Sequence, residues 1–275
     1  EAYNDTTCLV EVDESPPEMI NQKALEEALK IALLLNCEIY QHSQIMRKTV
    51  IDGSNTSGFQ RTVLIAHNGI VETSFGKVRI DTIALEEDSA RIIKKDKEKA
   101  VYRLDRLGIP LIEISTAADM KTAEQVKETA LKIGEILRAC KVKRGIGTIR
   151  QDVNISIKGH DRVEVKGFQE PSMMIKTIDK EIERQKNDIK KKKKIGDVRN
   201  ALPNGETEFL RPLPGRARMY PETDLPLLYI SRDLINNLKK NLPKLKSEIR
   251  DELKKKGLSQ ELINLVVDGS LDEFN

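Results

Sequence analysis

Apolar residues recur along the chain at two spacings, and each spacing predicts a different secondary structure. Where they recur every three or four positions, one face of a helix is apolar and can pack on a core. Asn21 and Thr122 stand where a polar side chain can cap such helices. Helices are therefore predicted over residues 22–36, 122–139, 172–189 and, as a polar helical segment, 231–275.

Between these helices, apolar and polar residues alternate, which is typical of half-buried strands. Strands are predicted over residues 8–12, 47–51, 60–67, 70–73, 78–85, 149–158 and 162–166. Asn68-Gly69 favours a tight hairpin turn. Residues 200–226 contain five prolines and are predicted to form an irregular, ordered loop or an extended segment. Because tight turns suit antiparallel pairing better than long crossovers, we expect an α+β fold with an antiparallel or mixed sheet.

The predicted hairpin over residues 149–166 has one apolar and one polar face. Five residues alternate onto the polar face: Arg150, Asp152, Asn154, Glu164 and Lys166. The carboxylates could bind magnesium. The cations beside them could neutralise a phosphoryl group during its transfer. A polar face of this kind is more often plain solvated surface, so the hairpin by itself leaves both interpretations open.

A second group of charges lies between residues 85 and 114. Glu113 stands in an apolar Leu-Ile-Glu-Ile-Ser segment, where a carboxylate is costly unless it is paired or bound to a metal. Glu86 and Glu87 precede it, and Arg103 and Arg106 lie between them. The concentration of charge within thirty residues favours a functional site over a surface strand.

Composition limits the class of protein. The chain has 275 residues, 33% charged and 39% hydrophobic, enough for one large or two modest domains. The net charge is only +3, but Lys190–Lys194 is an unbroken lysine run. Such runs are usually solvated, although this one would attract the phosphate backbone of an RNA docked nearby. The three scattered cysteines suggest a reducing cytosol, and no membrane partner is expected.

Several common site motifs are missing. Gly53 and Gly58 have the spacing of a P-loop, but Phe59-Gln60 replaces the Lys-Ser/Thr pair that would contact phosphates and magnesium. The sequence contains neither a Gly-x-Ser-x-Gly elbow nor a Gly-x-Gly-x-x-Gly dinucleotide motif. The sparse cysteines and histidines argue against zinc, so magnesium is the metal that the acidic residues suit best.

Motifs along nearly the whole chain resemble the GatB/GatE family, the kinase and transamidase subunits of tRNA-dependent amidotransferases. The segments that carry the resemblance are 1–8, 46–60, 85–88, 102–114, 147–156, 163–167 and 210–226. Ser-Asn-Thr-Ser-Gly-Phe-Gln, Leu-Arg-Pro-Leu-Pro-Gly and Tyr-Pro-Glu-Thr-Asp are most similar to the archaeal GatE branch.

The resemblance implies a cradle-shaped catalytic domain related to glutamine synthetase and guanidino kinases. On this basis we expect the cradle over residues 1–230 and the start of a helical domain over residues 231–275. The domain that the archaeal branch carries near residues 189–195 would be missing, and the family's N-terminal His and Glu would precede Glu1. We therefore expect a truncated subunit.

The resemblance also implies a reaction. The γ-carboxylate of glutamate on Glu-tRNA(Gln) would be phosphorylated by ATP with Mg²⁺, then amidated by ammonia from a partner amidase similar to GatD. The chain would act in the cytoplasm as part of a heterodimer or larger assembly. Two alternatives stay open: a non-catalytic tRNA-binding or assembly module, and a small-molecule carboxylate kinase.

The family motifs assign roles to individual residues. Glu87 and Glu113 are expected to bind the metal with Glu86 beside them, and Lys48 and Arg150 to take part in catalysis. The expected nucleotide and cofactor contacts are Lys48, Arg150, Asp152, Asn154, Glu164 and Lys166. Arg211 and Glu222 are expected at the rim of the cradle.

Overall fold

The computed structural model describes residues 9–10, 14–96, 98–145, 147–168, 170–213, 215 and 217–269. Its helices are α1 Gln22–Leu34, α2 Ala123–Ala139, α3 Pro171–Lys190, α4 Arg232–Lys240, α5 Lys246–Lys255 and α6 Gln260–Gly269, with a 3-10 turn η1 at Leu104–Arg106. Its strands are β1 Glu38–Ile39, β2 His42–Ser43, β3 Met46–Thr49, β4 Phe59–Thr73, β5 Gly76–Glu87, β6 Arg91–Lys95, β7 Ala100–Arg103, β8 Pro110–Thr116, β9 Val153–Ile155, β10 Val163–Lys166, β11 Asp197–Ala201, β12 Thr207–Pro212, β13 Met219–Pro221 and β14 Leu228–Tyr229.

The larger sheet is antiparallel and has the order β13-β3-β4-β5-β8, with β1 also paired to β4. The helix α1 packs against it through Leu25 and Leu29, which are 2% and 0% exposed. Val63 and Leu85 supply the strand side of the same core. Since alternate residues of a strand point to opposite faces, the other face of β3, β4, β5 and β8 is available for polar side chains.

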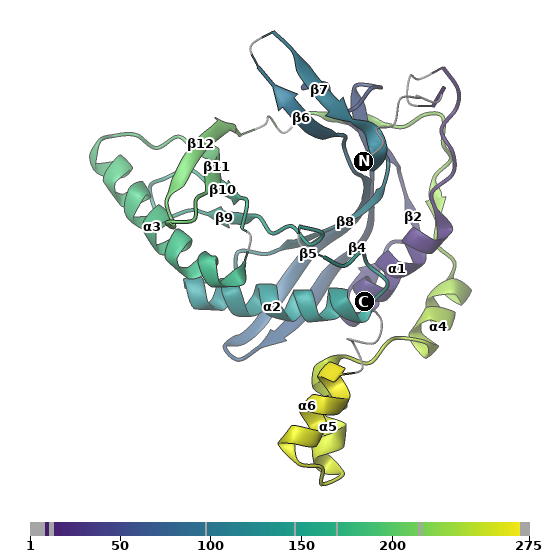
Figure 1. The fold of residues 1–275 in the computed structure, drawn as a ribbon. Helices are drawn as coiled ribbons and strands as arrows, with labels where there is room; N and C mark the ends of the chain where they lie inside the picture. Colours follow the sequence, from purple (N-terminus) through teal and green to yellow (C-terminus); the bar gives the residue numbers. More distant parts are fainter. Residues whose placement is uncertain are drawn as a thin grey trace.

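The smaller sheet has the order β12-β11-β10-β9 and is mixed, because β10 and β11 are parallel while the other pairs are antiparallel. Met174 and Ile178 of α3 pack on Val163 and Val165 of β10. The helix α2 contacts both α3 and β4, and it joins the two sheets along one side (Figure 1). Mixed α+β architecture with antiparallel pairing is thus confirmed.

The strongest local signals are confirmed. The Asn21 side chain accepts a hydrogen bond from Ala24 N at 3.0 Å, which caps α1. Thr122 and Gln125 form a capping box at the start of α2. The hairpin β9–β10 forms as expected, with Asn154 opposite Glu164.

The predicted turn at Asn68-Gly69 is wrong. The strand β4 continues through both residues, and the chain reverses at Ser74-Phe75 instead. Asn68 has φ of 52°, which bends the strand without ending it. Gly69 is needed for close packing, because a Cβ there would lie 2.3 Å from Cys37 Sγ.

The segment over residues 200–226, predicted as an ordered loop or an extended segment, is extended in part. It contains the end of β11 together with β12 and β13. Pro212 ends β12 and Pro221 ends β13, and both strands lie at sheet edges, where a missing N–H is tolerated. The strand expected over residues 8–12 lies largely outside the described residues.

The helices expected after residue 230 are present. Leu234 and Leu238 of α4 join the core beneath α1. The helices α5 and α6 pack on each other and extend away from the sheets (Figure 1). None of the helices in the described part of the chain is long and apolar enough to cross a membrane. A domain boundary at residue 230 stays a prediction.

Within the larger sheet, a buried group of ion pairs joins the end of β13 to β3 and β4. The carboxylate of Glu222 is 2.8 Å from the Nε atoms of both Arg47 and Arg61, and its side chain is 0% exposed. The Phe59 ring lies 4.2 Å from the Arg47 guanidinium and 5.0 Å from that of Arg61. Burial alone would raise the pKa of Glu222, but hydrogen bonds from Arg47, the Asp224 backbone and Arg61 lower it to about 2.

We predict that Gly69→Ala destabilises the protein by about 1–3 kcal/mol, as overpacking of a core does. The new methyl group would meet Cys37 Sγ at 2.3 Å and the Leu35 carbonyl oxygen at 2.8 Å. Gly215→Ala is the matched control, because its Cβ would meet nothing within 4 Å. Urea unfolding of both variants measures the difference, and equal stability of the two would contradict the packing argument.

We predict that Glu222→Gln costs about 3–5 kcal/mol of unfolding free energy, because two buried guanidinium groups lose their charged partner. Asp224→Asn is the control: that side chain is 50% exposed, so less than about 1 kcal/mol is expected.

The ion pairs of Glu222 also make the stability of the protein depend on pH. Glu222 has a pKa lowered from 4.5 to about 2, so its contribution is complete above about pH 5 and fades as pH falls toward 2. The stability gap between the unaltered chain and Glu222→Gln should shrink over that range. A gap that is unchanged between pH 5 and pH 2.5 would show that the carboxylate is not the stabilising species.

Candidate active site between the two sheets

The pairing of β5 with β8 decides which acidic side chains share a face. Glu86 and Glu87 are neighbours in β5, so they point to opposite faces. Glu86 pairs with Leu111, and Ala84 pairs with Glu113. Glu113 therefore lies on the same face as Glu86, one diagonal step away.

Glu113 is not placed among the apolar residues that flank it in sequence. Ile112 and Ile114 pack into the core on one face of β8, whereas Glu113 is exposed on the other. A strand sends neighbouring side chains to opposite faces, so the apolar residues beside Glu113 in the sequence do not surround its carboxylate. The position on the polar face still leaves it open to a ligand.

Lys48 joins the two carboxylates. Its Nζ atom lies 2.8 and 3.0 Å from the two carboxylate oxygens of Glu86. Protein atoms around the Glu113 carboxyl group raise its pKa by desolvation, and the charge and hydrogen bond of Glu86 raise it further. Lys48 and Lys166 act in the opposite direction. Two carboxyl groups and two ammonium groups thus interact in one place.

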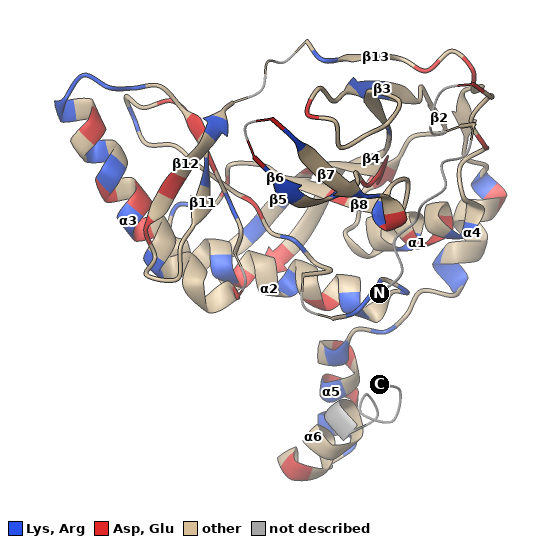
Figure 2. Ribbon diagram, turned by 45° about the horizontal axis from the view of Figure 1, so that its top comes forward, with Lys and Arg blue, Asp and Glu red and all other residues tan. Residues whose placement is uncertain are grey.

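The second ammonium comes from the smaller sheet. Lys166 Nζ in β10 lies 2.5 Å from Asp152 and 2.6 Å from Glu164. Burial would lower the pKa of Lys166, but hydrogen bonds with both carboxylates raise it above its ordinary value. Because Lys166 also acts on Glu113 in β8, the polar faces of the two sheets meet here. Figure 2 shows residues of both charge signs on the strands of both sheets.

A second link between the sheets lies at the end of β5. Arg150, just before β9, donates to Asp88 Oδ2 at 2.9 Å. Arg106 Nε is 3.5 Å from the same oxygen and donates to the Ser89 carbonyl at 2.8 Å. Arg150 is therefore held at the junction of the sheets, beside the pair formed by Glu86 and Glu113 rather than between them.

The remaining predicted residues are spread around this centre. Asn154 is exposed on β9 opposite Glu164, on the polar face of the hairpin. Arg211 of β12 lies near Asp52. Burial would raise the pKa of Asp52, but hydrogen bonds with Ser54 and the charges of Lys95 and Arg211 lower it. The role of Arg211 at the rim of the cradle stays a prediction.

Glu87 is not brought together with Glu86 and Glu113. It lies on the opposite face, where its carboxylate accepts from Arg61 N at 3.1 Å and is 3.3 Å from the Arg61 guanidinium. Glu222 contacts that same arginine, so it too lies away from the carboxylate pair. Among the described residues, no group of three or more acidic, histidine or cysteine side chains gathers as a metal site. The three-glutamate ligand set stays a prediction.

Three residues in the neighbourhood were not singled out as site residues from the sequence. Asp88 anchors Arg150, Arg61 holds Glu87, and Gln60 donates from Nε2 to the Glu87 carbonyl oxygen. Asp88 ends the Leu-Glu-Glu-Asp run, so its acidity was a usable signal. Arg61 and Gln60 are recognisable only from the pairing of β4 with β3 and β5.

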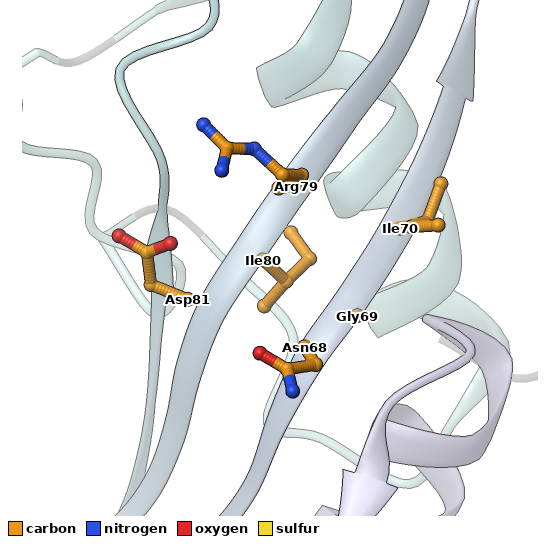
Figure 3. A pocket seen from close by; sticks show the side chains of 6 residues that line it. All are labelled: Asn68, Gly69, Ile70, Arg79, Ile80 and Asp81. Carbon is orange, nitrogen blue, oxygen red and sulfur yellow. The ribbon is translucent and has the colours of Figure 1, made fainter.

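A separate pocket lies on the bent part of the larger sheet (Figure 3). It is lined by Asn68, Gly69, Ile70, Arg79, Ile80 and Asp81. The guanidinium of Arg79 lies 2.7 Å from Asp119, which engages it outside the pocket. The pocket therefore lacks the paired carboxylates and ammonium groups found between the sheets.

Comparison with known proteins identifies the relatives of this chain. The model of the GatB/GatE catalytic domain matches residues 2–236. A protein named as the E subunit of glutamyl-tRNA(Gln) amidotransferase, from Methanocaldococcus jannaschii, is 36% identical over 403 residues, covering 96% of this chain and 64% of the relative. The protein of that name from Pyrococcus abyssi is 36% identical over 412 residues, covering 100% and 65%.

A third relative of the same name, from Methanococcus maripaludis, is 47% identical over 221 residues, covering 76% of this chain and 35% of its own. The chain thus spans just under two thirds of the length of the relatives that align with nearly all of it. The matched domain and the alignments that cover nearly all of this chain lead to one conclusion: the chain belongs to the GatB/GatE catalytic domain family.

Proposed function

We propose that the chain catalyses the two-step conversion of Glu-tRNA(Gln) to Gln-tRNA(Gln). A γ-carboxylate oxygen of the tRNA-bound glutamate attacks the γ-phosphorus of ATP, and ADP leaves. Ammonia then attacks the acyl phosphate, and inorganic phosphate leaves. The observation that carries the proposal is the meeting of Glu86, Glu113, Lys48 and Lys166 between the sheets.

The carboxylate pair fits a magnesium ion. Mg²⁺ usually takes one or two protein carboxylates and completes its octahedron with water and phosphate oxygens. Glu86 and Glu113 supply such a pair, and their mutual repulsion, which raises the pKa of Glu113, is what a cation would relieve. When bound, Mg²⁺ would neutralise charge on the ATP phosphates.

The ammonium groups suit the transfer step. The attacking glutamate and the ATP phosphates are both anionic, so their approach needs cationic groups already in place. Lys48 comes from the larger sheet and Lys166 from the smaller one, so a phosphoryl group between the sheets is within the field of both. Arg150, tethered to Asp88, adds a guanidinium at the junction.

Asp152, Glu164 and Asn154 complete the polar face of the hairpin. Asp152 and Glu164 orient Lys166 through ion pairs of 2.5 and 2.6 Å. Asn154 lies opposite Glu164 and is free to face a nucleotide. We assign these residues to positioning the nucleotide rather than to the reacting bonds.

The proposed activity needs further components. Ammonia has to come from a partner amidase similar to GatD, in a cytoplasmic complex of two or more chains. We assign residues 1–230 to the cradle and residues 231–275 to the start of a helical domain, with an inserted domain missing near 189–195. The alignments with relatives run over 403 and 412 residues whereas this chain has 275, so the relatives carry additional residues within the aligned region.

We predict that Glu113→Gln lowers tRNA-dependent ATP hydrolysis by about 100- to 1000-fold, because one of the two carboxylate charges that would bind the cation is lost. Binding of Glu-tRNA(Gln) should be unchanged. Glu72→Gln is the matched control, since Glu72 lies on β4 with its side chain 67% exposed. Single-turnover hydrolysis with and without Glu-tRNA(Gln) measures both effects.

The alternatives predict other outcomes. A non-catalytic tRNA-binding module would show no tRNA-dependent hydrolysis in the unaltered chain. A small-molecule carboxylate kinase would hydrolyse ATP equally well with and without Glu-tRNA(Gln). Full turnover by Glu113→Gln would refute the assignment of the site.

A further inference from the structure

We propose that the end of α3 is a docking surface for the sugar-phosphate backbone of the tRNA, which rests on the proposed function. The surface, here called the basic cap, consists of Lys158, Arg162, Lys186 and Lys190–Lys194. All eight side chains belong to exposed residues. Figure 2 shows the run that leaves α3 as a continuous basic stretch.

The basic cap is an ordered structure, not a loose lysine tail. Lys191 N donates to the Asn187 carbonyl at 3.2 Å, and Lys193 N donates to that of Asp188 at 2.8 Å. Lys192 has φ of 59°, the left-handed conformation that commonly ends a helix. At the far end of the run, Asp161 N donates to the Lys194 carbonyl at 2.9 Å.

The hairpin β9–β10 brings the other cations to the same place. Its turn lies against α3, since a Cβ on Gly159 would be 3.7 Å from Ile189 Cδ1. A Cβ on Gly196 would collide with the Arg162 carbonyl oxygen at 2.0 Å. The backbone on both sides of Lys158 and Arg162 is thus packed against the segment that carries the lysines.

Acidic side chains of the described residues do not account for these cations. Within the described part of the chain, no ion pair involves any of the eight side chains. The nearest acid on the helix, Asp188, is already 2.6 Å from Arg184. A run of cations this dense therefore leaves its charge available to an external polyanion.

Helix stability does not account for the basic cap. The negative end of a helix dipole favours one or two cations in the last turn, and Lys190 already occupies it. Lys186 and Lys190 are four residues apart and repel each other. Lys192 occupies a left-handed position that glycine fills at lower cost. The added lysines therefore repel one another in the isolated chain, and a bound anion would reduce that repulsion.

The position of the basic cap fits an RNA better than a small substrate. One end of the β9–β10 hairpin carries Lys166 at the candidate active site, and the other carries Arg162. At about 3.3 Å per residue, these ends are about 13 Å apart along the strand. The anionic part of ATP is its phosphate chain, so an ATP molecule bound at the carboxylate pair would leave the basic cap without an anion. An RNA strand with a phosphate on every nucleotide can occupy both ends.

The test replaces all five lysines of Lys190–Lys194 with glutamine. The matched control replaces five other lysines on the α1 and α2 side of the protein: Lys23, Lys121, Lys132, Lys141 and Lys143. Both variants lose five positive charges, so only the location differs. The probe is a tRNA(Gln) transcript, and its dissociation constant is measured for each protein at several salt concentrations.

If the basic cap binds the backbone, the first variant should bind at least tenfold more weakly at low salt. Its plot of log affinity against log salt should lose about 0.7–0.9 in slope for every phosphate contact removed. The control should keep the slope of the unaltered chain. Equal slopes and equal affinities in the two variants would overturn the proposal.

Two further measurements distinguish a failure of this proposal from a failure of the proposed function. If the first variant loses binding to anionic lipid vesicles while its tRNA binding equals that of the control, the surface serves a membrane and the proposal is wrong. The ATP hydrolysis of the unaltered chain tests the proposed function separately. A chain without tRNA-dependent hydrolysis would refute that function, whereas a reduced salt slope would still support an RNA surface.

Discussion

The pleat of the larger sheet determines which charged side chains can meet. In β5, the adjacent residues Glu86 and Glu87 must point to opposite faces. Glu86 meets Glu113 and Lys48 on one face, and Glu87 meets Arg61 on the other. The two faces thus carry different tasks. One presents Glu86, Glu113 and Lys48 to the smaller sheet, and the other uses its charges to hold strands together.

The strand-holding face and the candidate active site share the same backbone. Arg47 is bound to buried Glu222, and the next residue of β3 is Lys48, whose side chain reaches Glu86. Arg61 is bound to the same Glu222 and lies in β4 between β3 and β5. Because a buried ion pair resists rearrangement once both partners are in place, it limits how far Lys48 can move relative to Glu86.

The sequence predicts the parts of the fold that depend on local chemistry. The caps at Asn21 and Thr122 and the alternation of β9–β10 are local, and all are confirmed. The Asn68-Gly69 turn was wrong because the glycine serves tertiary packing against Cys37, which no local pattern reveals.

The residues of the candidate site also divide into those that the local sequence predicts and those that depend on tertiary structure. Glu113, Glu86 and Lys48 could be found from their motifs, and the structure brings them together. Glu86 and Glu87 both lie in β5, where side chains alternate between the two faces of the sheet. Glu87 must therefore lie apart from the other three residues. The partners of Glu222 depend on pairing between residues more than 160 positions apart, so they could not be found without the strand register.

The central claim is that metal and nucleotide bind between the sheets at Glu86 and Glu113. The most direct measurement is anomalous diffraction from crystals of the chain soaked with Mn²⁺ and a non-hydrolysable ATP analogue. The account predicts a manganese peak within bonding distance of carboxylate oxygens of both residues, with the phosphates toward Lys166. A manganese peak away from both Glu86 and Glu113, or nucleotide bound away from the facing sheets, would contradict it.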